Sequence, residues 1–229
     1  MSGFDAAAVA GWIAEATETG NPLAVLEPPR DADEAAEIAA AALEAMGQVA
    51  CGVRVLARGG AMIAGPMTEA RLVPAGAPIA TDALRHAEVT AAAIGVLAEP
   101  LDPDDDAAAV FARIHPALDV SAMRYGERVE DPLLLAADLG RLGLVVAGKG
   151  RAVAAGATRV ALGAKGARGA ECDLGARFAE AARFARDWGG LPAGALLVVA
   201  GLTPAAAPAG TLRASLSGIG SVETSFTAE

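Results

Sequence analysis

Aromatic side chains, lysines, cysteines and histidines are all scarce in this sequence. Aromatic residues make up only 3% of the 229 residues although hydrophobic residues make up 54%, so a core must be built from Ala, Val, Leu and Ile. Only Lys149 and Lys165 are lysines among the 18 basic residues. The two cysteines, Cys51 and Cys172, are too few for a disulfide framework and do not form a Cys-x-x-Cys site, so we expect small buried residues there.

Basic charge is also scarce. The formal net charge is −10 and the pI is about 4.7, which argues against nucleic-acid and anionic-membrane binding because both require basic patches. Residues 1–20 contain acids and no basic n-region, which argues against a secretory signal. Residues 188–212 are uncharged, but prolines and glycines divide them into strands and turns, which excludes a membrane span. We therefore expect a cytoplasmic protein.

The residue pattern changes from helical to β-like near residue 50. An apolar stripe predicts a helix that ends near Gly20, and a second helix is predicted from Asp31 or Asp33 to Gly47. A later helix is predicted in 173–189, with a buried face of Leu174, Phe178, Ala181, Ala185 and Trp188. Short β-like runs fill the remaining sequence. We therefore predict an α+β fold in a single domain, 1–229, with a helical N-terminal region (1–50) and a mostly β body (51–229).

Two intervening segments have less regular patterns. In "DPDDDAAAVFARIHP" (102–116), acids would cap a helix and a proline would stop it, so we predict a short helix. The segment "LVVAGKGRAVAAGATRVALGA" (144–164) predicts a hairpin followed by another strand. Its first residues approximate a phosphate-binding loop, but Gly150 stands where Ser or Thr would hold Mg²⁺ and no helix follows, which excludes a nucleotide site.

The two histidines each have a carboxylate nearby in the sequence. In "LRHAEVTAAAIGVLAEPL" (84–101), the period of a strand would place His86, Glu88 and Thr90 on one face. His115 stands four residues before Asp119. Together His86, Glu88 and Asp119 form a mixed nitrogen and oxygen set that would suit Mg²⁺, Mn²⁺, Fe²⁺ or Zn²⁺. The alternative is that these side chains lie on a solvated edge strand.

Four segments carry a resemblance to a known family. The C-terminal segment "GGLPAGALLVVAGLTPAAAPAGTLRASLSGIGSVETSF" is similar to the closing signature of the 2-keto-4-pentenoate hydratase family, in the fumarylacetoacetate hydrolase superfamily. The segments "GVRVLARGGAMIAGPM", "HAEVTAAAIGVLAEPL" and "IHPALDVSAMRY" resemble further family motifs, in the same order. The resemblance covers about residues 52–226. It implies a mixed β-roll or barrel-like core of the fumarylacetoacetate hydrolase C-terminal-domain type, with N-terminal and inserted helices.

The resemblance also implies a divalent metal. In the family, two glutamates of an E-x-E motif and a later Glu or Asp hold Mg²⁺ or Mn²⁺, which chelates a small 2-keto acid. By position, the ligands in this chain would be His86, Glu88 and Asp119. The imidazole of His86 replaces a glutamate, removes one negative charge and would also suit Fe²⁺ or Zn²⁺.

Several positions depart from the family pattern. Arg54 stands in place of a lysine, and since arginine does not deprotonate near neutral pH it could clamp a carboxylate but could not serve as acid or base. Ala122 and Met123 replace an aspartate and a serine, whereas Arg124 is retained. We therefore assign the substrate clamp to Arg54 and Arg124, and a proton-carrying role to His115.

These features predict a divergent enzyme of the family. It would hydrate, decarboxylate or tautomerise a small anionic 2-keto or 2-hydroxydienoic acid through a metal-stabilised enolate. One alternative is an inactive member that serves as an oligomeric scaffold or partner subunit, and another is a hydrolase that cleaves C–C bonds in acylpyruvates. We expect a homo-oligomer whose partners are small anionic 2-keto acids and neither nucleic acid nor membrane.

Overall fold

The structure is a computed structural model that describes residues 5–82 and 84–227. Within these residues, one sheet has the strand order β2-β1-β10-β5-β6-β7-β3. In that order, its strands are Ala61–Thr68, Ala50–Arg58, Leu196–Ala200, Arg85–Leu97, Phe111–Met123, Leu142–Ala147 and Leu72–Pro74. A second sheet has the order β4-β12-β11-β8-β9, with strands Ile79–Ala80, Gly220–Thr227, Gly210–Leu216, Ala157–Gly163 and Ala170–Asp173. Both sheets are mixed, because β1 pairs with β10, β3 with β7 and β4 with β12 in parallel.

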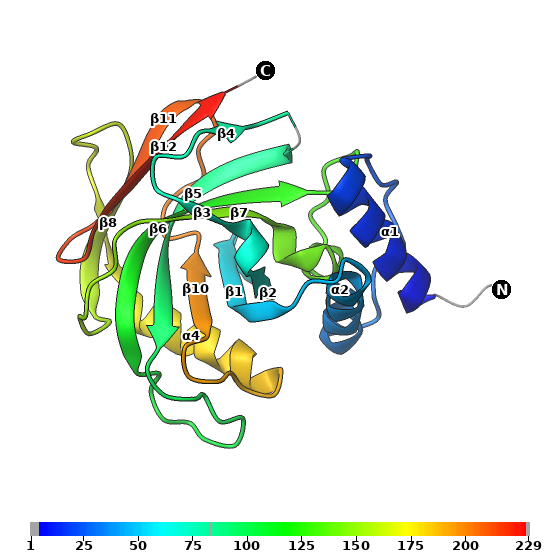
Figure 1. Cartoon of the computed structure of the whole chain (residues 1–229), viewed down its shortest axis with the longest axis horizontal. Helices are drawn as coiled ribbons and strands as arrows, with labels where there is room; N and C mark the ends of the chain where they lie inside the picture. The colour runs from blue at the N-terminus through cyan, green and yellow to red at the C-terminus, as the bar shows by residue number, and fades with distance from the viewer. Residues whose placement is uncertain (1–4, 83, 228–229) are drawn as a thin grey trace.

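The helices lie around these sheets and confirm the predicted α+β class. They are α1 (Ala6–Thr19), α2 (Ala32–Ala45), α3 (Pro132–Ala137) and α4 (Leu174–Asp187), with short 3-10 turns η1 (Glu69–Arg71) and η2 (Leu139–Arg141). Figure 1 shows α1 and α2 on the side of the molecule opposite β8, β11 and β12, with α4 below the sheets. The helix at the N-terminus ends at Gly20, as predicted, and Asp31 is the residue that caps α2.

Two apolar clusters fix the layers. One lies between the seven-stranded sheet, the five-stranded sheet and α4, and includes Val55, Leu118, Phe178, Val160 and Leu216. The other packs α1, α2 and α3 on the opposite face of the seven-stranded sheet, and includes Ile13, Ile38, Ile94, Leu135 and Val198. The small side chains of the sequence allow this close packing of helices and strands.

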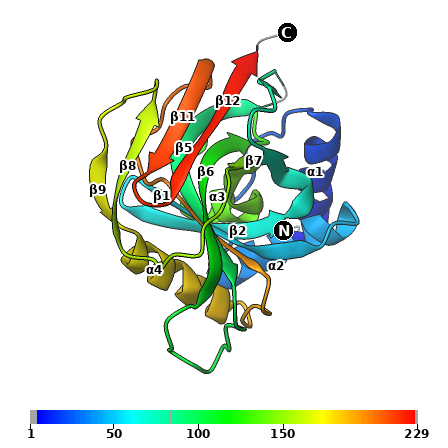
Figure 2. The ribbon, with the colours of Figure 1, turned by 60° about the vertical axis from the view of Figure 1, so that its left-hand side comes forward.

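The seven-stranded sheet is strongly curled, as Figure 2 shows. Strands β1 and β6 are three positions apart in it, which in a flat sheet would separate them by about 14 Å. Yet Nε of Arg54 on β1 lies 2.5 Å from Oδ1 of Asp119 on β6. The sheet must therefore curl until β1 and β6 face each other, although it does not close, because β2 and β3 remain at its ends.

The short helix predicted in residues 102–116 is wrong. Phe111–Met123 form strand β6, and 102–110 form the loop that leads into it. The acids satisfy their own loop, since Asp102 accepts a hydrogen bond from the backbone of Asp104, and Asp105 accepts one from Ala107. Phe111 packs its ring against Phe178 of α4, with ring centroids 4.4 Å apart. Tertiary packing and pairing with β5 thus override the capping pattern.

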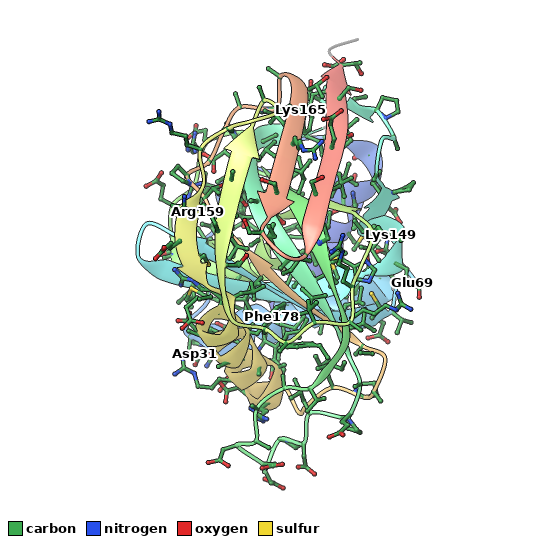
Figure 3. The ribbon with its side chains drawn as sticks, turned by 90° about the vertical axis from the view of Figure 1, so that its left-hand side faces the viewer. Asp31, Glu69, Lys149, Arg159, Lys165 and Phe178 are labelled. Carbon is green, nitrogen blue, oxygen red and sulfur yellow. The ribbon has the colours of Figure 1, made fainter. Side chains whose placement is uncertain are left out.

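The predicted hairpin in residues 144–164 is also wrong. Strand β7 belongs to the seven-stranded sheet, and β8 belongs to the five-stranded sheet. The connecting segment, which carries Lys149 (Figure 3), passes from one sheet to the other, and Arg151 makes an isolated bridge to Ile114. The glycines of this segment allow its backbone to pass close to neighbouring side chains. A Cβ at Gly150, for example, would lie 2.4 Å from the His115 ring.

Among the described residues, none of the helices combines the length and the apolar character needed to cross a membrane.

Candidate functional site

A fully buried ion pair joins the two facing strands of the curled sheet. Arg54 donates from Nε to Oδ1 of Asp119 at 2.5 Å and from Nη2 to Oδ2 at 2.6 Å. The same guanidinium donates to the hydroxyl of Ser121 at 2.8 Å and, through Nη1, to the carbonyl of Gly140 at 2.6 Å. Ser121 in turn donates to Asp119 at 2.7 Å. The pair is therefore satisfied at almost every polar atom, which a buried charge requires.

Three more arginines surround Glu88, on strand β5. Arg58 of β1 and Arg128 each donate a hydrogen bond to its carboxylate, one to each oxygen. Arg141 donates to Oε2 of Glu88 at 3.2 Å and to the backbone carbonyl of His86 at 3.3 Å. Because Glu88 lies directly opposite Ser121 in the pairing of β5 with β6, it is adjacent to the buried pair on the same face of the sheet. We call Arg54, Arg58, Arg128, Arg141, Glu88 and Asp119 the arginine cluster.

Positive charge exceeds negative charge in the arginine cluster. It combines four guanidinium groups with two carboxylates, and the further carboxylate nearby, that of Glu130, is 76% exposed. Burial, followed by the charges of Arg58, Arg54 and Arg128, lowers the pKa of Arg141 to about 10. Nε of Arg141 is buried and has no hydrogen-bond partner within the described part of the chain. The cluster therefore has both uncompensated positive charge and an unused buried donor.

Arg141 reaches the cluster from an unusual turn. Leu139, Gly140 and Arg141 all have left-handed backbone conformations, with φ of 52°, 61° and 61°, which cost about 1–2 kcal/mol for each residue other than glycine. Strand β2 passes directly against this turn, since a Cβ added at Gly140 would lie 2.7 Å from the Cα of Gly65. Close approach of two glycines thus holds the strained turn that places Gly140 O and Arg141 in the site.

His86 departs from the expected alternation of β5. The pairing with β6 shifts register between Arg85 and Glu88, and His86 has φ of 49°, which marks a β-bulge. Its ring Nε2 lies 3.0 Å from the carbonyl oxygen of Gly126. The ring forms no hydrogen bond or ion pair with Glu88, and the bulge removes the simple period of two that would place the two side chains on one face.

The other predicted site residues lie elsewhere. Arg124 donates to the carbonyls of Asp138 and Leu142 and to Oγ1 of Thr17, and pairs with the carboxylate of buried Asp138. His115 places Nδ1 2.9 Å from the carbonyl oxygen of Gly148, at the segment that links the two sheets. The structure thus brings Arg54, Glu88 and Asp119 together, while the side-chain hydrogen bonds of Arg124, His115 and His86 lie outside the arginine cluster.

The residues as arranged do not fit a divalent cation. A metal would need the free oxygen lone pairs of Glu88 and Asp119, but five guanidinium nitrogens donate to these two carboxylates. In the described residues, no three His, Cys, Asp or Glu side chains gather as a metal-binding group. The ligand set His86, Glu88 and Asp119 therefore stays a prediction that this arrangement does not support.

Four contributors were missed from the sequence: Arg58, Ser121, Arg128 and Arg141. Arg58 lies four residues after Arg54 on β1, and Ser121 lies two residues after Asp119 on β6, so the period of a strand puts each on the face of its neighbour. That signal was present in the sequence. Arg128 and Arg141 come from a loop and a left-handed turn, for which the sequence has no comparable periodic signal.

Comparisons with known proteins agree on the fold. No protein-family model matches the chain, and no curated protein matches it. Among solved structures, 4-oxalocrotonate decarboxylase from Pseudomonas putida G7, complexed with magnesium and adipate, is 21% identical, with 97% of each chain covered and a TM-score of 0.79. The same enzyme complexed with calcium and acetate gives a TM-score of 0.78 at 21% identity, again with 97% of each chain covered. A 2-hydroxyhepta-2,4-diene-1,7-dioate isomerase from Mycobacterium marinum is 14% identical, with 77% of this chain and 74% of that chain covered and a TM-score of 0.55.

These neighbours confirm the predicted fold class. The chain shares the mixed α+β fold of the fumarylacetoacetate hydrolase superfamily, with two mixed sheets and helices around them. The neighbours named here are a decarboxylase and an isomerase rather than a hydratase, so they show the fold and not membership of the narrower hydratase family. The two decarboxylase structures contain magnesium or calcium.

Proposed function

We propose that this chain is an enzyme that binds a small anionic 2-oxo acid at the arginine cluster and moves a proton through an enolate. The observation that carries the proposal is the excess of guanidinium groups around Glu88 and Asp119. Guanidinium groups bind carboxylates through paired hydrogen bonds, and fixed positive charge stabilises an oxygen that gains negative charge in a reaction. The fold, shared with enzymes that act on small acids, agrees with this proposal.

Glu88 is the candidate base. Its side chain is 18% exposed, whereas Asp119 is fully buried and held at both oxygens by Arg54. In the proposed step, Glu88 takes a proton from the carbon next to the 2-oxo group, and the C–H electron pair forms the C=C bond of the enolate. The carbonyl electron pair moves onto oxygen, where the guanidinium groups stabilise it. Return of the proton to the oxygen gives the 2-hydroxy tautomer, and in a substrate with a further conjugated C=C bond, return to the distant carbon of that system moves the double bond.

Decarboxylation and hydration remain part of the proposal, because both can give an enolate of a 2-oxo acid. Loss of CO₂ does so when the carboxylate lost is β to the 2-oxo group or conjugated with it, and addition of water does so at a conjugated C=C bond. The neighbours that hold magnesium or calcium support a metal in this fold, but the engaged carboxylates of this chain do not fit one, and no step is assigned to it. Mg²⁺ or Mn²⁺, and Fe²⁺ or Zn²⁺ through His86, therefore enter the proposal only as additions to be tested.

A second candidate is a non-catalytic member of the superfamily that binds an acid or a partner subunit. The observation in its favour is that arginines already donate hydrogen bonds to both carboxylates, which would make either carboxylate a weaker base. The hydrolase alternative needs a histidine paired with a carboxylate to activate water. In the described residues, His86 and His115 contact the backbone carbonyls of Gly126 and Gly148 and form no ion pair with a carboxylate, so no such histidine–carboxylate pair supports that alternative.

Proton exchange tests the enzyme proposal directly. In D₂O, the enzyme should exchange the C3 protons of pyruvate or 2-oxobutanoate for deuterium, followed by NMR, and Glu88→Gln should lower the rate at least 100-fold. Glu171→Gln, in an exposed pair on the second sheet, is the matched control and should exchange at the wild-type rate. If wild type and Glu88→Gln exchange equally slowly, with and without added Mg²⁺, the chain is not such an enzyme and the binding role is favoured.

A further inference from the structure

We propose that the exposed edge of the arginine cluster is a metal-independent carboxylate-binding site, formed by Arg58 and Arg128, in which Glu130 acts as an internal competitor. The proposal deepens the function proposed above, since it says how the acid is bound and what it must displace. Its ligand class is a small carboxylic acid, such as a 2-oxo acid or a short dicarboxylate.

Arg58 and Arg128 each have N–H donors that their hydrogen bonds to Glu88 do not use. Arg58 uses Nη1 and Arg128 uses Nη2 to hold Glu88. In the described residues, Nη2 of Arg58 and Nε of Arg128 donate no hydrogen bond. Both face the carboxylate of Glu130, which lies 3.9 Å from the first and 3.8 Å from the second. Two guanidinium groups therefore direct unused N–H donors toward the same position, near the carboxylate of Glu130.

Glu130 lies at that position without forming a close hydrogen bond to either arginine. Its distances of 3.8 and 3.9 Å to the two arginines exceed the 2.7–2.9 Å of a charge-assisted hydrogen bond, so it contributes charge without a good bond. Its side chain is 76% exposed and that of Arg128 is 47% exposed, so the position opens to solvent. A free carboxylate of matching size could make both hydrogen bonds and replace Glu130.

Charge favours such a ligand. The positive charges of Arg58 and Arg128 repel each other, and burial together with Arg128 lowers the pKa of Arg58. Behind them, Arg141 is fully buried, and among the described residues its Nε has no acceptor and Glu88 is the one carboxylate that contacts all three arginines. An added anion would compensate positive charge that the chain leaves uncompensated, and it would do so without a metal.

Titration calorimetry with pyruvate and adipate as probes, in EDTA, tests the proposal. Wild type should bind at least one probe saturably, Arg128→Gln should weaken binding at least tenfold, and Glu130→Gln should strengthen it about three- to tenfold because it removes the competing charge. Arg159→Gln and Glu171→Gln are matched controls and should bind as wild type does. Arg159 lies on the second sheet (Figure 3), and its exposed pair with Glu171 has the same 3.8 Å separation.

The results separate this inference from the enzyme proposal. Binding in EDTA with the expected variant pattern supports the site even if no proton exchange occurs, in which case the enzyme proposal alone fails. Binding that appears only with Mg²⁺, or that is unchanged in Arg128→Gln and in Glu130→Gln, overturns the site even if the protein exchanges protons. Thermal melting of each variant confirms that a loss of binding does not come from unfolding.

Discussion

Arg54 and Asp119 form a two-point ion pair that is fully buried between strands β1 and β6. These strands are not neighbours in the sheet, so the pair crosses the interior of the curl rather than running along it. Ser121 and the Gly140 carbonyl complete its hydrogen bonds. The pair therefore links the two facing strands of the curled sheet, and it neutralises the carboxylate that the family resemblance assigns to a metal.

Removing one member of this pair should be costly. Asp119→Asn should lower the free energy of unfolding by about 3–5 kcal/mol, because it leaves the buried charge of Arg54 without its partner. The double variant Arg54→Met with Asp119→Leu should lose less than Asp119→Asn alone, since no charge is left unpaired. Urea denaturation measures both. A double variant that loses as much as the two single changes together would contradict this account of the pair.

The close approach of Gly65 and Gly140 should be sensitive to one methyl group. Gly140→Ala must fit a Cβ 2.7 Å from the Cα of Gly65 and also adopt φ of +61°. Gly76→Ala is the matched control, because its φ is +83° but nothing lies within 4 Å of the added Cβ. The control should cost about 1 kcal/mol for the backbone alone, and Gly140→Ala should cost about 1–3 kcal/mol more. Equal losses in urea denaturation would show that the steric contact is unimportant.

The stability of the protein should depend on pH through Asp138. Burial raises the pKa of this carboxyl from 3.8 to about 6, against the opposing effect of Arg124. Between these values the folded protein holds a proton that the unfolded chain has released, so folding becomes less favourable as pH rises from about 4 to 6. Relative to Asp138→Asn, which cannot titrate, wild type should lose about 1–3 kcal/mol of stability across this range. Unfolding curves at several pH values measure the difference, and parallel dependence in both proteins would contradict the shift.

The sequence predicted most of the elements because their signals are local. Asp31 caps α2, Gly20 ends α1, and the buried face of α4 follows the spacing of Leu174, Phe178 and Ala181. The sequence-based prediction failed where contacts between distant residues determine the structure. In residues 102–116, strand β6 pairs with β5, and Phe111 packs against Phe178. Alanine weakens such predictions further, since it fits buried and exposed faces equally well.

The sequence predicted only some of the residues of the site. Arg54, Glu88 and Asp119 sit in motifs that resemble a known family, and the structure brings them together. The family resemblance could not indicate that arginines would engage both carboxylates, because Arg128 and Arg141 reach the site from a loop and a left-handed turn. His86 left the expected face because a β-bulge interrupts the strand at that residue.

The most direct test of the central claim, that arginines rather than a metal engage Glu88 and Asp119, is a Mn²⁺ titration followed by electron paramagnetic resonance. Carboxylate sites accept Mn²⁺ readily, and bound ions lose the sharp signal of the free ion. The account predicts that the signal rises in proportion to added Mn²⁺, in wild type and in Glu88→Gln alike. Loss of one equivalent of signal in wild type, abolished in Glu88→Gln, would contradict it and restore the metal site that the sequence predicted.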